Sequence, residues 1–172
     1  VFAYAGEVEA THFNGLGRVL AQLLRLVGSP LPLDAGNAGA PAFVTVTEDA
    51  AGAGQFWTRQ YGRPNGRFPQ TVRSTKRFTG PTGCEEWVTR WLGMSLNVRV
   101  EDGALYFDSQ RYLLKLFGRS VALPTWLTPG RLRVGHRAIG DTAFRFTLEL
   151  IHPLFGPLLH QSILFRDLED NR

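Results

Sequence analysis

The residues best suited to binding or catalysis are large aromatic side chains that alternate with arginine along segments with a two-residue period. Trp57, Arg59 and Tyr61 occupy alternate positions, so their side chains share one face if this segment is a β-strand. Aromatic walls with a few polar anchors are typical of a pocket for a small molecule. The candidate ligand-binding residues are therefore Trp57, Arg59, Tyr61, Arg73, Trp87, Tyr106, His136 and His160.

The same period groups other side chains on later segments. Trp87, Thr89 and Trp91 are expected on one face of a strand, and Tyr106, Asp108, Gln110 and Tyr112 on one face of another. The alternative interpretation is that the tryptophans fill the core and the arginines lie in solvent. Arginine stacked on tryptophan or tyrosine is also common where no ligand binds.

Arg59 carries the sharpest of these predictions. A guanidinium cannot lose its proton, so an arginine inside the fold needs partners for its five donors. Because two large aromatic residues flank Arg59 on its face, we predict that it lies inside the fold or at its rim. There it should make at least one charge-assisted bond, to a carboxylate, a ligand or a bound anion.

The sequence contains no catalytic signature: G-x-G-x-x-G, the P-loop, G-x-S-x-G and H-E-x-x-H are all missing. His136 and His160 share the phase of neighbouring apolar residues, so both are expected to point inward. Either could act as a general base beside an arginine that anchors an anion. Cys84 is the single cysteine, which excludes an internal disulfide and a cysteine-based zinc site. We expect no catalytic residues, no metal and no cofactor.

A helix is predicted over residues 12–27, where seven apolar residues recur at three- and four-residue spacing. Thr11 is the expected N-cap, and Gly28 followed by Pro30 ends the helix. The apolar stripe is expected to dock on a sheet. A membrane-surface helix would need more cations opposite this stripe than Arg18 and Arg25 supply.

Residues 42–168 have the period of an antiparallel sheet. About nine strands are expected, at 43–48, 55–61, 67–78, 84–92, 95–101, 104–117, 131–139, 143–152 and 158–167. Short turns join most of them, whereas residues 118–130 are expected to be irregular. The predicted fold is mainly β (α+β), a single domain over residues 1–172. One N-terminal helix packs on a strongly curved, roughly nine-stranded antiparallel meander sheet or partly closed barrel.

Composition restricts the function classes. The net charge is +4, and 17 of the 19 cations are arginines spread from Arg18 to Arg172 rather than clustered, which argues against nucleic-acid binding. No apolar run is long enough to span a bilayer. Glu7 and Glu9 interrupt the first apolar stretch, so a signal peptide is not expected. We expect a cytoplasmic protein without a membrane span.

Three motifs carry a resemblance to a known family. FWTRQYG at 56–62, GRSVALPTWLTPG at 118–130 and PLFGPLLHQSILF at 153–165 resemble, in this order, signatures of the bacterial family called domain of unknown function 4166. His160 and Ser162 stand where that family usually carries a tyrosine and a glycine. Family members occur alone or behind a saccharopine-dehydrogenase-like NAD(P)-binding domain. The resemblance therefore implies an accessory or ligand-presenting role beside a dehydrogenase-like partner, and it brings no cofactor to this chain.

The leading functional hypothesis is a non-enzymatic binding domain that encloses a small apolar or amphipathic ligand in its curved sheet. The alternatives are an enzyme of unknown type that uses His136 or His160, and a protein-interaction module. An internal cavity of a few hundred cubic ångströms would favour the first hypothesis.

Overall fold

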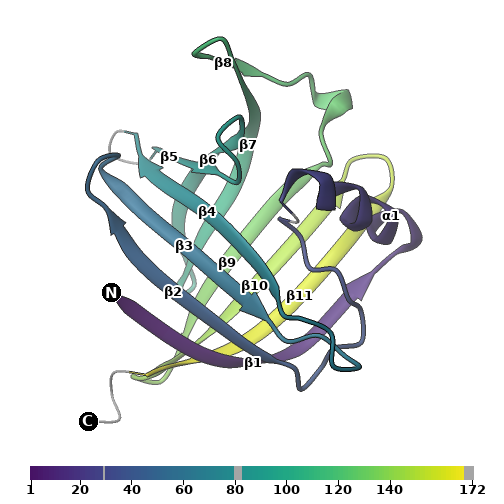
Figure 1. Ribbon diagram of the computed structural model, residues 1–172, viewed down its shortest axis with the longest axis vertical. Helices are drawn as coiled ribbons and strands as arrows, with labels where there is room; N and C mark the ends of the chain where they lie inside the picture. Colours follow the sequence, from purple (N-terminus) through teal and green to yellow (C-terminus); the bar gives the residue numbers. More distant parts are fainter. Residues whose placement is uncertain (29, 80–82, 169–172) are drawn as a thin grey trace.

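The computed structural model describes residues 1–28, 30–79 and 83–168 (Figure 1). These residues form eleven strands, one α-helix and two short 3₁₀ helices. The strands are β1 (Phe2–Phe13), β2 (Pro41–Asp49), β3 (Gly54–Tyr61), β4 (Gln70–Phe78), β5 (Gly83–Trp87), β6 (Leu92–Glu101), β7 (Ala104–Leu116), β8 (Arg119–Ala122), β9 (Arg131–Ile139), β10 (Ala143–His152) and β11 (Gly156–Asp167). The helices are α1 (Gly15–Leu23), η1 (Leu24–Val27) and η2 (Thr125–Leu127). None of the helices described is long and apolar enough to cross a membrane.

Ten strands close into an antiparallel barrel. Consecutive strands pair from β1 to β7, β9 follows beside β7, and β11 pairs with β1 to complete the ring. The eleventh strand, β8, pairs only with the last part of β7, at Leu113–Leu116. The prediction of a mainly β fold with one helix on a curved antiparallel barrel is confirmed.

Two strands, β1 and β8, lie outside the nine that the sequence predicts. β1 occupies residues 2–13, of which the last two had been assigned to the helix, and β8 lies inside the segment expected to be irregular. β1 is hard to recognise because Ala3, Ala5 and Gly6 weaken its pattern. Gly6 is required there, since a Cβ atom would lie 2.4 Å from the Leu164 carbonyl oxygen of β11. β1 pairs with both β2 and β11, and this double pairing closes the barrel.

Two predictions about which residues share one face of a strand are also wrong. β5 ends at Trp87, so Thr89 and Trp91 lie in the turn before β6. In β7 the pairing register with β6 shifts, because Ser109 and Arg111 oppose consecutive residues and Gln110 forms a bulge. The bulge sends Tyr112 to the inner face, where it packs against the core, whereas Asp108 keeps the outer face.

The predicted helix exists, but it starts later and packs differently. Asn14 is the N-cap, its side chain accepting a 2.7 Å hydrogen bond from the Gly17 amide, and Thr11 belongs to β1. Gly28 ends the helical segment with a φ of 91°, as expected. The helix rests on the start of β11 through Gly17 and Ala21, because a Cβ on Gly17 would lie 2.0 Å from the Leu158 carbonyl oxygen. Docking through the whole apolar stripe is therefore wrong: three of its positions, Leu16, Val19 and Leu23, remain exposed, whereas Leu20 and Leu24 pack against the core.

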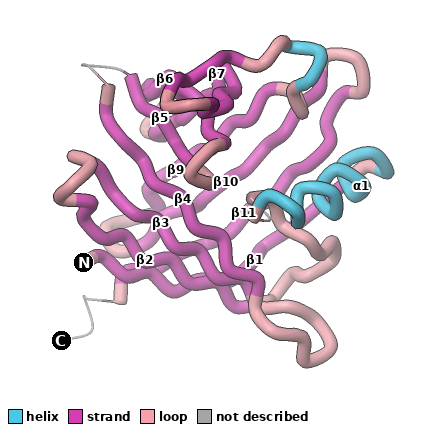
Figure 2. The backbone as a smooth tube through the Cα atoms, turned by 45° about the horizontal axis from the view of Figure 1, so that its top comes forward, coloured by secondary structure: helices cyan, strands magenta, loops and turns pink. Residues whose placement is uncertain are grey.

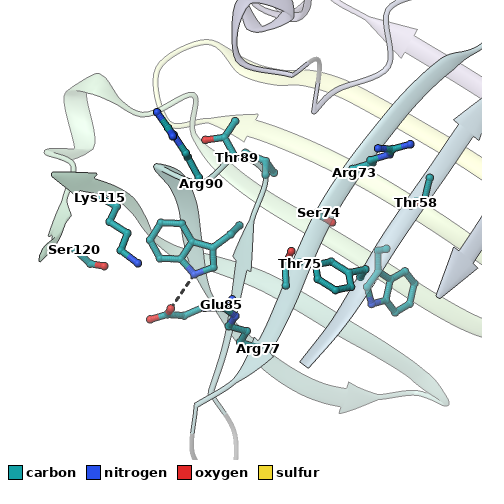
Figure 3. Close-up of a pocket in the computed structure, with 14 residues that line it drawn as sticks. Thr58, Arg73, Ser74, Thr75, Arg77, Glu85, Thr89, Arg90, Lys115 and Ser120 are labelled. Carbon is teal, nitrogen blue, oxygen red and sulfur yellow. Dashed lines mark hydrogen bonds between the residues drawn. The ribbon is translucent and has the colours of Figure 1, made fainter. Parts of the chain in front are cut away.

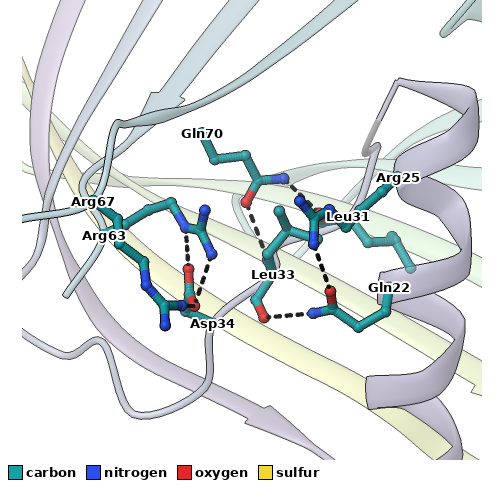
Figure 4. Close-up of polar contacts among 8 residues, drawn as sticks. All are labelled: Gln22, Arg25, Leu31, Leu33, Asp34, Arg63, Arg67 and Gln70. Atoms are coloured by element: carbon teal, nitrogen blue, oxygen red, sulfur yellow. Dashed lines mark hydrogen bonds and ion pairs between the residues drawn. The ribbon is translucent and has the colours of Figure 1, made fainter. Parts of the chain in front are cut away.

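Polar contacts fasten the connection after η1 to the barrel (Figure 4). The Gln70 side chain donates to the Leu31 carbonyl at 2.7 Å and accepts from the Leu33 amide at 3.0 Å. Arg63 forms an ion pair with Asp34 through its Nε atom and a second bond through Nη2. Figures 1 and 2 show that α1, η2 and the β10–β11 turn lie at the same end of the barrel, away from the N-terminus.

Candidate functional site

A cluster of charged and aromatic side chains lies inside the barrel. The strand period turns Trp57, Arg59 and Tyr61 of β3 inward, as it does Ser74 and Lys76 of β4, Glu86 of β5 and His136 of β9. Pairing between strands sets these side chains opposite one another, with Lys76 facing Glu86 and Trp57 facing Ser74. Glu85 and Glu86 lie on opposite faces, so only Glu86 belongs to the cluster.

Arg59 and Glu86 form an ion pair in this interior. The Arg59 Nη2 atom is 2.8 Å from Glu86 Oε1, and only 12% and 5% of the two side chains are exposed. The Ser74 hydroxyl donates to the same carboxylate oxygen at 2.6 Å and lies 3.2 Å from Arg59. Burial by itself would raise the pKa of Glu86, but the charges of Lys76 and Arg59 and these hydrogen bonds lower it to about 2. The prediction that Arg59 makes a charge-assisted bond is confirmed.

Lys76 is the second interior cation, and its surroundings are aromatic. Lys76 is 2% exposed, and its ammonium lies 4.2 Å from the ring centres of both Trp57 and Phe107. No hydrogen bond or ion pair reaches this ammonium from residues 1–28, 30–79 and 83–168. Burial lowers the pKa of Lys76, and the nearby Glu86 only partly opposes this effect. Lys76 was not among the predicted site residues, although it shares the inner phase of Val72 and Ser74 and is one of only two lysines.

Aromatic rings surround His136, and no hydrogen bond reaches it from the described part of the chain. Its ring centre lies 5.6–5.9 Å from those of Trp57, Phe107, Phe144 and Phe146. Burial, together with the positive charges of Lys76 and Arg59, lowers the pKa of His136 to about 3. The imidazole is therefore neutral at physiological pH. Burial also raises the pKa of the neighbouring Tyr61.

Side chains fill most of the space around this cluster. The enclosed cavity measures about 10 Å³ and is lined by Val44, Trp57, Arg59, Tyr61, His136, Phe144, Phe146 and Phe165. This volume holds about one water molecule. A ligand larger than water must therefore displace inner side chains.

A much larger groove, of about 830 Å³, lies on the outside of the same wall (Figure 3). It forms where β5 ends at Trp87, because residues 70–74 of β4 pair with β3 alone. Its lining includes the cations Arg73, Arg77, Arg90 and Lys115 and the aromatic residues Phe56 and Trp87. The Trp87 indole donates to Glu85 at 3.0 Å and lies over Gly93, where a Cβ would be 2.7 Å from the ring.

The groove and the interior meet at two residues. Trp57 lines both the groove and the enclosed cavity, and Ser74, which binds Arg59 and Glu86, also lines the groove. A movement of the half-buried Trp57 side chain would therefore join the two spaces.

Comparison with known proteins assigns this chain to a family. The model of a family described as a domain of unknown function (DUF4166) matches residues 1–165. The chain belongs to this family. The resemblance inferred from three short motifs is thereby confirmed. No curated protein and no solved structure matches the chain.

The first motif of this DUF4166 chain builds the interior site. FWTRQYG corresponds to most of β3 and supplies Trp57, Arg59 and Tyr61 to the cluster. Its glycine has a packing role, because a Cβ on Gly62 would lie 2.8 Å from the Pro41 ring. The second motif ends at Gly130, whose φ of 108° and close contact with Ile151 also exclude a side chain. Of these two motifs, the first therefore supplies the residues of the interior cluster.

The eight candidate residues of this DUF4166 chain fall into separate groups. Trp57, Arg59, Tyr61 and His136 meet inside the barrel, and Arg73 and Trp87 line the outer groove. The two remaining residues lie elsewhere.

Tyr106 lies on the outer face of the barrel over Gly135. The guanidinium groups of Arg99 and Arg133 lie near its ring, and both form ion pairs with Asp108. The inward orientation expected for His160 is wrong: it is half-exposed and lies 3.4 Å from Glu149 of β10. Its neighbours Leu159 and Gln161 occupy the inner face instead.

No group of three histidine, cysteine or acidic side chains that could hold a metal occurs in the part of the chain that the structure describes.

Proposed function

We propose that this barrel binds a small amphipathic molecule and holds its anionic group, such as a carboxylate, with the Lys76 ammonium. One observation carries the proposal. Among the residues that the structure describes, the interior holds two cations, Arg59 and Lys76, but one carboxylate, Glu86, which already forms an ion pair with Arg59 and a hydrogen bond with Ser74. Lys76 is left with two aromatic faces as its contacts.

An unpaired buried cation is expensive for the folded state. Removing an ion from water costs several kcal/mol, and cation–π contacts with two rings offset about 2 kcal/mol of this cost when desolvated. A bound carboxylate would complete the charge balance and restore the pKa of Lys76 toward its ordinary value. This reasoning supports a role for Lys76 in binding rather than in stability.

The outer groove supports the same proposal by supplying space and a route. Its volume of about 830 Å³ falls within the range of small-molecule sites, and its four cations outnumber the one acid of its lining, Glu85, so the groove attracts an anion. The interior cavity alone is too small, so the ligand would enter by displacing Trp57, with its apolar part between Trp57 and Trp87.

Binding is favoured over base catalysis by the state of His136. A general base works best when its pKa lies near the operating pH, whereas burial and two cations lower the pKa of His136 to about 3. We further propose that the protein is bacterial and cytoplasmic and presents its ligand to a dehydrogenase-like partner.

The test compares octanoate with 1-octanol, which has a similar tail and a neutral head. Isothermal titration calorimetry should show octanoate binding at least about tenfold more tightly, since a charge-assisted bond contributes about 1.5–3 kcal/mol. Lys76→Met should abolish this preference. The matched control is Arg137→Met, which removes one exposed cation beside the β6–β7 turn, at the end of the barrel away from α1. This variant should keep the preference for octanoate.

Two results would contradict the proposal. One is equal affinity of the wild-type protein for octanoate and octanol. The other is an octanoate affinity that survives Lys76→Met but falls in Arg73→Gln, which would place the anion in the groove.

A further inference from the structure

The outward face of α1 and η1 is apolar. Leu16, Val19, Leu23 and Leu26 recur at helical spacing and are exposed, with Leu26 at 87%. The helix packs on β11 through the opposite face, at Gly17 and Ala21. Four large apolar side chains on one helix face are thus left in solvent.

η2 and the β10–β11 turn lie at the same end of the barrel as α1 (Figures 1 and 2). These two segments carry four further exposed apolar side chains, Trp126 and Leu127 in η2 and Leu154 and Phe155 in the turn. Two contacts connect these segments. The amide of Asn14, beside α1, donates to the Leu158 carbonyl just after the β10–β11 turn, and Gly130, just after η2, lies against Ile151 and His152 just before that turn. We call these eight residues the apolar end: Leu16, Val19, Leu23, Leu26, Trp126, Leu127, Leu154 and Phe155.

The segments that build the apolar end carry charges of one sign. Residues 14–33, 109–140 and 150–158 contain no aspartate or glutamate. The exposed cations of these segments near the apolar end are Arg18, Arg25, Arg111, Lys115, Arg119 and Arg131. The acid that follows α1 in sequence, Asp34, is already bound by Arg63 and Arg67.

We propose that the apolar end docks on a membrane surface that contains anionic lipid. Apolar side chains that insert at the boundary between headgroups and acyl chains, ringed by arginines that reach lipid phosphates, form an interfacial binding surface. Trp126 suits this depth because tryptophan favours the interface. The two arginines of α1 are too few for a helix acting alone, but the neighbouring segments supply four more cations. A second copy of the chain would bring the same positive charges face to face, so self-association through this end is disfavoured.

The experiment is co-sedimentation with vesicles of phosphatidylcholine alone or with 30% phosphatidylserine. The wild-type protein should bind the phosphatidylserine vesicles more tightly, and added salt should weaken the binding. Arg18→Gln/Arg25→Gln should lower the affinity for these vesicles about 30-fold, since each cation near an anionic surface contributes about fivefold. Leu23→Glu/Leu26→Glu should lower it about 100-fold or more.

Matched controls carry the same changes elsewhere on the barrel. Phe78→Glu/Val100→Glu replaces two exposed apolar residues near the opposite end, and Arg137→Gln/Arg166→Gln removes two exposed cations there. Both controls should bind like the wild-type protein. Because all the substituted side chains are exposed, thermal unfolding should show that each variant remains folded.

Three results would overturn the proposal: no binding to either vesicle, equal binding to both, or unchanged binding by Leu23→Glu/Leu26→Glu. A stable dimer that this double variant dissociates, measured by light scattering, would instead assign the apolar end to a second copy. The proposal does not depend on the octanoate site, since none of the variants used here alters the interior cluster or the groove.

Discussion

Replacing Lys76 with methionine removes the interior cation that forms no ion pair with a carboxylate of the described residues, and it keeps most of the side-chain volume. The folded protein loses cation–π contacts with Trp57 and Phe107, which contribute about 2 kcal/mol when desolvated, and it loses the attraction of Glu86 for the ammonium. It also avoids burying an ammonium that is 2% exposed, which costs several kcal/mol. The Arg59–Glu86 pair remains neutral and hydrogen-bonded. We expect Lys76→Met to stabilise the protein by about 1–2 kcal/mol.

The assay is urea unfolding at several pH values. The pKa of Lys76 is lowered in the folded state, so the unfolded chain binds more protons between that pKa and 10.5. Wild-type stability should therefore gain from Lys76 as the pH rises through this window, and Lys76→Met should lack this gain. The difference in unfolding free energy between Lys76→Met and the wild type should therefore be largest at neutral pH and become smaller toward pH 10.5. A variant that is less stable than the wild type by 1 kcal/mol or more at pH 7 would refute this expectation. It would show that Lys76 stabilises the fold through its attraction to Glu86.

Three further changes test the interior. Arg59→Lys should cost about 1–3 kcal/mol in urea unfolding, because lysine cannot reproduce the guanidinium contacts with Glu86 and Ser74; an unchanged midpoint would contradict this. Through His136, the wild-type protein should lose about 2 kcal/mol of unfolding free energy between pH 7 and pH 5, and His136→Leu should lack this loss. The unfolded chain takes up a proton near 6.5 that folded His136, with its pKa of about 3, does not; an unchanged pH slope would show that His136 is not buried. Leu96→Asp should abolish cooperative thermal unfolding, followed by circular dichroism, since Leu96 is 4% exposed; a cooperative transition would place Leu96 on the outer face.

The interior part of the site could be predicted because the two-residue period of a strand is local information. It places Trp57, Arg59 and Tyr61 on one face, and the cost of a solitary buried guanidinium then predicts the ion pair of Arg59. The partner was not predictable, since Glu86 reaches Arg59 across β4, and pairing between strands depends on register. The bulge at Gln110 shows the same limit: one extra residue reverses the face of Tyr112.

The placement of the helix could not be read from its periodicity. The apolar stripe indicates a helix but does not say which of its residues touch the barrel. Small residues decide this, because Gly17 lets the helix backbone approach Leu158 more closely than a leucine face could. His160 fails for a related reason: both faces of its strand carry apolar residues, Leu158 and Leu164 on one and Leu159 and Ile163 on the other, so the inner face is ambiguous until Gln161 is found fully buried.

The central claim is that Lys76 anchors an anionic ligand, and an NMR titration of the lysine side chains tests it most directly. The chain has only two lysines, Lys76 and Lys115, so selective isotope labelling gives two signals that Lys115→Met assigns. We expect Lys76 to titrate below 10.5 in the free protein and its pKa to rise when octanoate binds, with no such rise on addition of 1-octanol. A Lys76 signal that titrates at its ordinary value and does not respond to octanoate would contradict the account.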